Sequence, residues 1–213
     1  MRDALSFSRL QLDALQEISS IGAGNASTSL SQFINQKVEM APPEVTTLTV
    51  RDVPSFVSKG SPIITMVVLE VEGDIGGHIL FIFDEKNAVM MIDLLMGQES
   101  GSTASLSEIG VSALKEVSSV MSGSYLRALG DMINLTLTMT PPYFTAGSPF
   151  EIPKFIIEHC IKEQETTICL KSNLSIAKEF QVYGSLMFIP SAASLGHLLN
   201  LLGIPDEASP QPQ

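Results

Sequence analysis

The chain has 213 residues, of which 45% are hydrophobic and 16% are charged, and its formal net charge is −11. This length fits one large domain or two small ones with a normal apolar core. The acidic excess argues against nucleic-acid binding, which needs clustered lysine and arginine to replace phosphate counterions. No run approaches the roughly 20 apolar residues that span a membrane. The first residues lack the apolar region of a signal peptide, so we expect a cytoplasmic protein.

The N-terminal stretch predicts two consecutive helices. Apolar residues recur at helical spacing between residues 9 and 21 and predict a buried stripe made of Leu10, Ala14, Leu15, Ile18 and Ile21. The run from Gly22 to Asn25 interrupts this pattern and predicts a break. Asn25 or Ser27 would then cap a second helix that ends near Asn35.

Extended segments follow. Pro42 and Pro43 end the helical region, and residues 44–50 predict a strand. After a loop, residues 63–71 and 77–83 predict a hairpin that turns at Gly73 and Asp74. Residues 85–96 predict an amphipathic helix that ends at Gly97, a common helix-stop residue.

The second half predicts the same order after a polar connector at 98–105. We expect a helix over 107–121, a break at Gly123, and a second helix to about Asn134. Extended segments are predicted at 144–151, 155–162, 166–175 and 179–189. A last helix over 192–202 would end at Gly203, and the proline-rich residues 205–213 predict a disordered tail.

The two halves align at a constant offset of 99, which places Glu17 on Glu116 and Ser20 on Ser119. This predicts an internal duplication, with one repeat over about 9–97 and the other over about 106–204. Three strands per half are too few for an independent core. We therefore expect one pseudo-two-fold α/β (α+β) domain, built from two ααβββα repeats that share one sheet, with paired long helices outside.

A polar stripe on each first helix is the candidate site. Asp13, Glu17 and Ser20 are spaced i, i+4 and i+7, which places them on one helix face. The second copy repeats the spacing with Ser112, Glu116 and Ser119. A single such stripe is usually a solvated surface, and the matched second copy favours a functional site without establishing one.

Other catalytic and metal-binding patterns are missing from the sequence. The three histidines are scattered, and Cys160 and Cys169 lack histidines at zinc-site spacing. The cysteines flank a predicted turn at 163–166, and we expect buried thiols in place of a disulfide. No Gly-x-Ser-x-Gly elbow or phosphate-binding loop lysine is present, so we predict no metal site.

Two segments resemble the CheC family of chemotaxis proteins (the CheC/CheX/FliY type), closest to CheC. They are Ile-Gly-Ala-Gly-Asn-Ala at 21–26 and Gly-Ser-Tyr-Leu-x-Ala-Leu at 123–129. The family signature is Asp or Ser, three residues, Glu, two residues, Asn, then 22 residues and Pro. This spacing is matched twice, by Asp13, Glu17, position 20 and Pro43, and by Ser112, Glu116, position 119 and Pro142. The resemblance covers about residues 8–204.

The resemblance implies hydrolysis of the aspartyl phosphate on the response regulator CheY. It implies that Glu17 and Glu116 bind a lysine of CheY, while the Asn holds the attacking water in line. Asn is replaced by Ser at both sites, so Ser20 and Ser119, or the adjacent Ser19 and Ser118, would have to orient that water. The protein would need no cofactor of its own, because Mg²⁺ would be carried by CheY.

The resemblance also implies two functions without catalysis. The chain could be an adaptor that binds phosphorylated CheY or the receptor deamidase CheD. The possible CheD contact would be formed by Gly123, Tyr125, Leu126 and Leu129. A flagellar-switch role is the weaker alternative.

Overall fold

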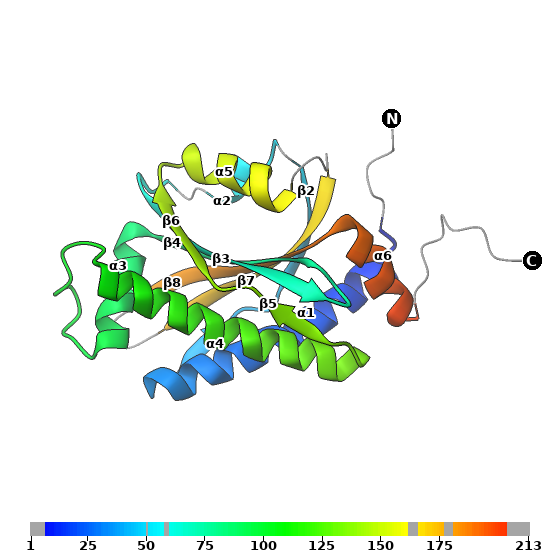
Figure 1. The fold of residues 1–213 in the computed structure, drawn as a ribbon, viewed down its shortest axis with the longest axis horizontal. Coiled ribbons are helices and arrows are strands. Elements are labelled where there is room, and N and C mark those ends of the chain that lie inside the picture. The colour runs from blue at the N-terminus through cyan, green and yellow to red at the C-terminus, as the bar shows by residue number, and fades with distance from the viewer. Residues whose placement is uncertain (1–6, 50, 58–59, 162–165, 177–180, 204–213) are drawn as a thin grey trace, which may run out of the picture.

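The protein folds into three layers around one antiparallel sheet (Figure 1). The computed structural model describes residues 7–49, 51–57, 60–161, 166–176 and 181–203, and within these ranges the sheet has eight strands. Two long helices, α1 (Arg9–Ile34) and α4 (Glu108–Ile133), lie side by side on one face. Short helices cover the other face. The predicted mixed α/β class, with one shared sheet and long outer helices, is confirmed.

Each long helix is continuous, so the predicted breaks at Gly22–Asn25 and at Gly123 are wrong. Gly22 is where α1 meets α4: a Cβ added there would lie 2.7 Å from a ring carbon of Tyr125. The glycine therefore lets the two helices approach, and the tertiary contact overrides its low helix propensity. Asn25 and Ser27 cap nothing, because their side chains donate to the carbonyl oxygens of Ile21 and Val38 (both 2.9 Å).

The helix ends explain why both helices are 26 residues long. Ser8 and Ser107 are the N-caps, and their Oγ atoms accept from the backbone N–H groups three residues later at 3.3 and 3.1 Å. Asn35 and Asn134 end the helices in the left-handed conformation, with φ of 51° and 53°. Each pair of caps is separated by 99 positions.

The strands of the two halves pair crosswise. The sheet order is β1–β7–β8–β4–β3–β5, with β2 also paired to β7 and β6 also paired to β3. The pairing of β2 with β7 corresponds, across the two halves, to the pairing of β6 with β3. Glu44 at the start of β2 lies opposite Lys171, and Tyr143 at the start of β6 lies opposite Val68. Glu44 and Tyr143 are 99 positions apart, whereas Val68 and Lys171 are 103 apart. The strands are β1 (Val38–Met40), β2 (Glu44–Thr49), β3 (Ile64–Gly73), β4 (Gly77–Asp84), β5 (Leu137–Met139), β6 (Tyr143–Gly147), β7 (Thr166–Ile176) and β8 (Val182–Pro190).

The strand predicted at 155–162 is wrong. This segment is helical, as α5 (Glu151–Ile156) followed by the π-helix η1 (Ile157–Ile161). Ile152, Ile156 and Cys160 recur every four residues and are all buried in the core layer on that side of the sheet. The loop predicted at 52–62 contains a short helix, α2 (Val53–Val57), and the short strands β1 and β5 were not predicted.

The core lies on both faces of the sheet. The predicted stripe on α1 is correct for Leu15 and Ile18, which are buried, but wrong for Leu10, whose surface is 64% exposed. Cys160 and Cys169 are buried thiols and not a disulfide, as expected. Burial raises the pKa of Cys169 to about 12, which keeps this thiol protonated.

Helix α3 (Glu85–Met96) and helix α6 (Ala192–Leu201) close the two ends of the sheet (Figure 1). The predicted stop of α3 at Gly97 is confirmed by a left-handed φ of 65°. The connector after α3 is held by Asp93, a fully buried carboxylate. Its oxygens accept from Gly101 N (2.7 Å), Ser102 Oγ (3.0 Å) and Thr103 N (2.9 Å).

We expect D93N to destabilise the fold by about 1–3 kcal/mol at pH 7, because donors that bind the carboxylate would face an amide. Burial acts to raise the pKa of Asp93, but hydrogen bonds from Thr103, Ser102 and Gly101 outweigh it and lower that pKa. The carboxylate therefore stabilises the protein above the unfolded pKa of about 3.9, and this stabilisation is lost as pH falls through the folded pKa. Urea unfolding at pH 7 and near pH 3 measures this. A D93N deficit that stays constant between the two pH values would contradict the assignment.

Candidate functional site

The long helices present both predicted polar stripes to solvent. Asp13 and Glu17 on α1 are exposed and Ser20 is half-buried. On α4, Ser112 and Glu116 are exposed and Ser119 is half-buried. Because α1 and α4 are regular helices, each stripe keeps its i, i+4, i+7 geometry along one face.

The two glutamates have open carboxylates. Within the described ranges, neither Glu17 nor Glu116 forms an ion pair or hydrogen bond through its side chain. Asp13 lies 3.9 Å from Arg9 Nε, but this exposed pair contributes little free energy. Both glutamates can therefore accept a cation from another molecule without first breaking an internal contact.

The two serines that replace the signature Asn are bonded to their own helices. Ser20 Oγ donates to the carbonyl oxygen of Gln16 (2.8 Å), and Ser119 Oγ donates to that of Lys115 (3.0 Å). The single hydroxyl proton is thus used inside the helix in both copies. What each hydroxyl still offers to solvent is acceptor capacity.

The alternative water-orienting serines are not accessible. Ser19 and Ser118 are each only 1% exposed. Ser19 Oγ shares a buried 3.0 Å hydrogen bond with the Tyr125 hydroxyl, between the two helices. Neither side chain can reach a phosphoryl group on a docked protein unless the helix pair opens.

The predicted prolines lie at the starts of strands. Pro43 is buried directly before β2, and Pro142 is half-buried directly before β6. Pro43 and Asp13 line the same shallow hollow between α1 and β2, together with Arg9 and Gln16. The structure therefore brings the first and last positions of the α1 signature to one surface.

The proposed CheD-contact residues are mostly in the core. Tyr125, Leu126 and Leu129 are at most 3% exposed and face the sheet or α1. Burial raises the pKa of Tyr125, so its hydroxyl stays neutral and bonded to Ser19. Only Gly123, which is half-buried, reaches the surface. A partner would have to contact α4 through other side chains.

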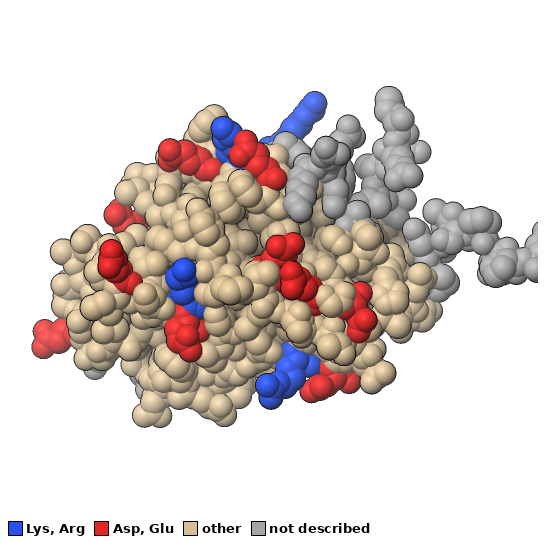
Figure 2. All heavy atoms as spheres, in the orientation of Figure 1, with Lys and Arg blue, Asp and Glu red and all other residues tan. Residues whose placement is uncertain are grey.

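The two stripes lie at different ends of the helix pair, because α1 and α4 run in opposite directions (Figure 1). On the face drawn in Figure 2, acidic and basic side chains are scattered, without a continuous basic patch. This surface does not resemble one that binds a nucleic-acid backbone.

Each stripe begins with an exposed apolar side chain, which sequence reasoning missed. Leu10 is 64% exposed and Ile109 is 67% exposed. Each precedes the first signature position by three residues, so it lies on the same helix face. Leu10 and Ile109 are also related by the 99-residue offset, and this relation is the sequence signal that could have identified them as part of the stripes.

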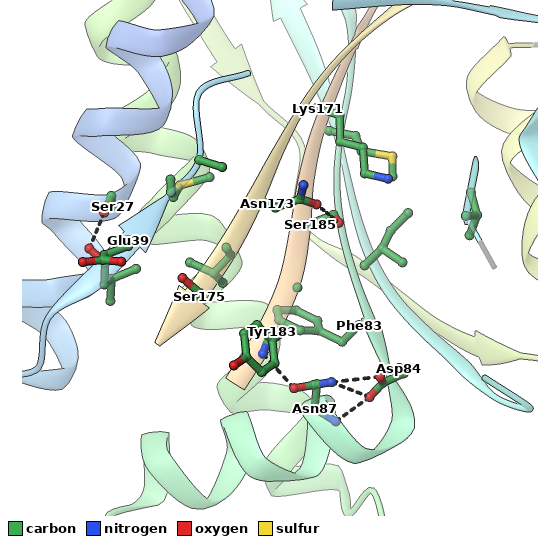
Figure 3. Close-up of a pocket in the computed structure, with 18 of the residues that line it drawn as sticks. Ser27, Glu39, Phe83, Asp84, Asn87, Lys171, Asn173, Ser175, Tyr183 and Ser185 are labelled. Carbon is green, nitrogen blue, oxygen red and sulfur yellow. Dashed lines mark hydrogen bonds between the residues drawn. The ribbon is translucent and has the colours of Figure 1, made fainter. Parts of the chain in front are cut away.

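A cavity of about 630 Å³ lies away from both stripes, over β7, β8 and the end of β4 (Figure 3). Its polar groups are largely bonded to one another. Asn173 Oδ1 accepts from Ser185 Oγ (3.2 Å), and Asn87 joins Asp84 to the backbone N–H of Tyr183. Lys171 donates to the Phe56 carbonyl oxygen (3.2 Å) and lies over its ring. These contacts hold the polar side chains named here in place, which indicates a structural role for them.

Two further searches of the described residues were negative. Within the ranges that the structure describes, no group of three or more His, Cys, Asp and Glu side chains is arranged to hold a metal ion. None of the helices in those ranges has the length and hydropathy that a membrane span requires.

Comparison with known proteins gives consistent matches. The sequence profile of the CheC-like family matches residues 10–46, from α1 into β2. The CheY-P phosphatase CheC of Bacillus subtilis is 31% identical over 134 residues, covering 62% of this chain and 64% of that protein. The flagellar motor switch phosphatase FliY of the same organism is 29% identical over 136 residues, covering 63% of this chain and 35% of that protein.

A solved structure shares the fold across nearly the whole chain. The crystal structure of Thermotoga maritima FliY superimposes with a TM-score of 0.77, at 22% identity, over 93% of this chain and 98% of that one. At this identity the match establishes the fold alone. The sequence matches span less than two thirds of either Bacillus protein.

Proposed function

We propose that this chain, which is similar to CheC-like proteins in sequence and fold, binds the phosphorylated form of a CheY-type response regulator at both polar stripes. Glu17 and Glu116 would each bind a lysine of the regulator. Hydrolysis of the aspartyl phosphate would be slow. The observation that carries the proposal is the pair of exposed, internally unbonded glutamates at matched positions on α1 and α4.

Slow hydrolysis follows from the two serines. Phosphoryl transfer to water depends on holding the water in line with the phosphorus atom. An Asn side chain is longer than Ser by one heavy atom and has both an N–H donor and a carbonyl acceptor. Ser20 and Ser119 are shorter and their protons are already donated to Gln16 and Lys115. A misplacement of about 1 Å can cost on the order of 10²-fold in rate.

The E17Q/E116Q double variant tests the binding proposal. We expect its affinity for the phosphorylated regulator to fall about tenfold or more, because each neutral amide loses the charge-assisted contact with a lysine. Isothermal titration with the receiver domain in its beryllofluoride-activated form measures this affinity. E158Q is the control, since Glu158 is an exposed carboxylate on the opposite layer.

Unchanged affinity in E17Q/E116Q would refute the assignment of the stripes as binding sites. Decay of the phosphorylated regulator, with and without this protein, then separates the two functions. Clear acceleration that E17Q/E116Q abolishes would identify a phosphatase. Binding without acceleration would identify an adaptor.

CheD is a second candidate partner, which the resemblance implies and which the same decay assay can include. The burial of Tyr125, Leu126 and Leu129 means that such a contact would use exposed α4 residues near Gly123, such as Arg127. The flagellar-switch role is the weaker proposal, because the match to Bacillus FliY covers only 35% of that protein and the likeness to Thermotoga FliY is one of fold.

A further inference from the structure

Resting on the proposed function, we propose that Leu10 and Ile109 are apolar anchors that contact the response regulator beside the two glutamates. Leu10 is 64% exposed on the first turn of α1, and Ile109 is 67% exposed on the first turn of α4. Each would insert into an apolar surface of the receiver domain while the glutamate about two turns later binds its lysine.

Both repeats keep a large apolar residue at the position of Leu10 and Ile109, although the residue directly before it differs between the repeats. Arg9 of the first copy aligns with Glu108 of the second, which reverses the charge. Leu10 and Ile109 differ in identity yet remain large, apolar and about two thirds exposed. Single exposed apolar residues are ordinary on protein surfaces. Two of them, at matched places beside the two polar stripes, form a repeated pattern with a shared location.

The local geometry makes each stripe a continuous contact surface. Leu10, Asp13 and Glu17 are spaced i, i+3 and i+7, so their side chains lie along one face. From Leu10 to Ser20 this face extends about 15 Å along the helix axis. Because Ser8 and Ser107 cap the helices, the first turns that carry Leu10 and Ile109 are fixed in place before a partner binds.

The charges identify the occupant as a protein with a lysine next to an apolar patch. Within the described ranges, the carboxylates of Glu17 and Glu116 have no internal cation, so a partner that buries them would have to supply one. An anionic lipid surface would be repelled by these carboxylates and by a chain of net charge −11. A receiver domain that binds as proposed would have to present both features on one folded surface.

The L10A/I109A double variant tests the anchors. We expect its affinity for the beryllofluoride-activated receiver domain to fall about tenfold, measured by titration calorimetry at several temperatures. The heat-capacity change on binding should become less negative, because less apolar surface is buried. The dependence of affinity on salt should stay as in the unmodified protein, whereas E17Q/E116Q should reduce it. F150A is the matched control, since Phe150 is 78% exposed before α5, in the opposite layer.

The outcomes separate the two proposals. If the unmodified protein does not bind the receiver domain, the proposed function fails and the anchors fail with it. If E17Q/E116Q weakens binding and L10A/I109A does not, the proposed function stands and the anchor proposal is overturned. A melting temperature equal to that of the unmodified protein is expected for L10A/I109A. Self-association that L10A/I109A abolishes, with receiver binding intact, would reassign the residues to a contact between copies of this chain.

Discussion

Replacing Ser20 and Ser119 together by asparagine is expected to accelerate hydrolysis of the phosphorylated regulator by on the order of 10²-fold. The carboxylates that bind the regulator are unchanged, so its affinity should change little. The added amide would extend past the helix backbone, whereas each serine hydroxyl now donates to the carbonyl four residues earlier. Phosphate release from the phosphorylated regulator at saturating and subsaturating concentrations measures kcat and KM separately, and the gain should be in kcat.

The chain offers a close control for that experiment. Thr28, two turns beyond Ser20 on α1, is exposed and donates to the Gly24 carbonyl oxygen at 2.9 Å. T28N therefore makes the same kind of change outside the signature and should leave the hydrolysis rate unaltered. If S20N/S119N binds the regulator without accelerating hydrolysis, water positioning is not the missing element.

Two glycines of α1, which are two residues apart and face different sides of the helix, should respond in opposite directions to the same substitution. G22A places a Cβ 2.7–2.9 Å from three ring atoms of Tyr125, a fully buried side chain. We expect a loss of about 1–3 kcal/mol in the free energy of unfolding, because α1 and α4 must move apart or the ring must leave its rotamer. G24A meets nothing within 4 Å and should stabilise the protein by about 0.5–1 kcal/mol.

Urea unfolding of both variants measures this difference, with the unmodified protein in the same series. The sign is decisive, since both changes add one methyl group within the same helix. A stabilising G22A would mean that the helices are not packed as described at Tyr125. In the binding assay, G24A should keep the affinity of the unmodified protein for the receiver domain, whereas G22A should not.

Much of the fold followed from local pattern. Hydrophobic periodicity predicted both central hairpin strands, α3 and its stop at Gly97. It failed where tertiary contacts outweighed helix propensity. Gly22 was predicted to break the helix, but it lies inside α1 at the contact with Tyr125 of α4. The segment around Ile156 and Ile157 is rich in β-branched residues, yet burial at every fourth position makes it helical. The crosswise strand order depends on contacts between distant residues, which periodicity cannot reveal.

The candidate site could be located from sequence, but its chemistry could not. Spacing placed Glu17 and Glu116 on exposed helix faces, and the structure agrees. Whether a serine hydroxyl points to solvent or to its own helix depends on a side-chain torsion, which spacing does not determine. Leu10 was misassigned to the buried stripe because the periodic pattern continues past the point where the core ends.

The crosswise pairing of strands bears on how the chain acquires its structure during synthesis. Thr47 of β2 pairs with Ile168 of β7, and Val67 of β3 pairs with Phe144 of β6. When the first half leaves the ribosome, β1, β2 and one edge of β3 have no partners, and they must wait for segments made much later. Such long-range contacts slow folding and leave strand edges open to wrong partners. The two halves, cut at the 98–105 connector, should therefore be insoluble when expressed separately and should recover the fold only when they are produced together.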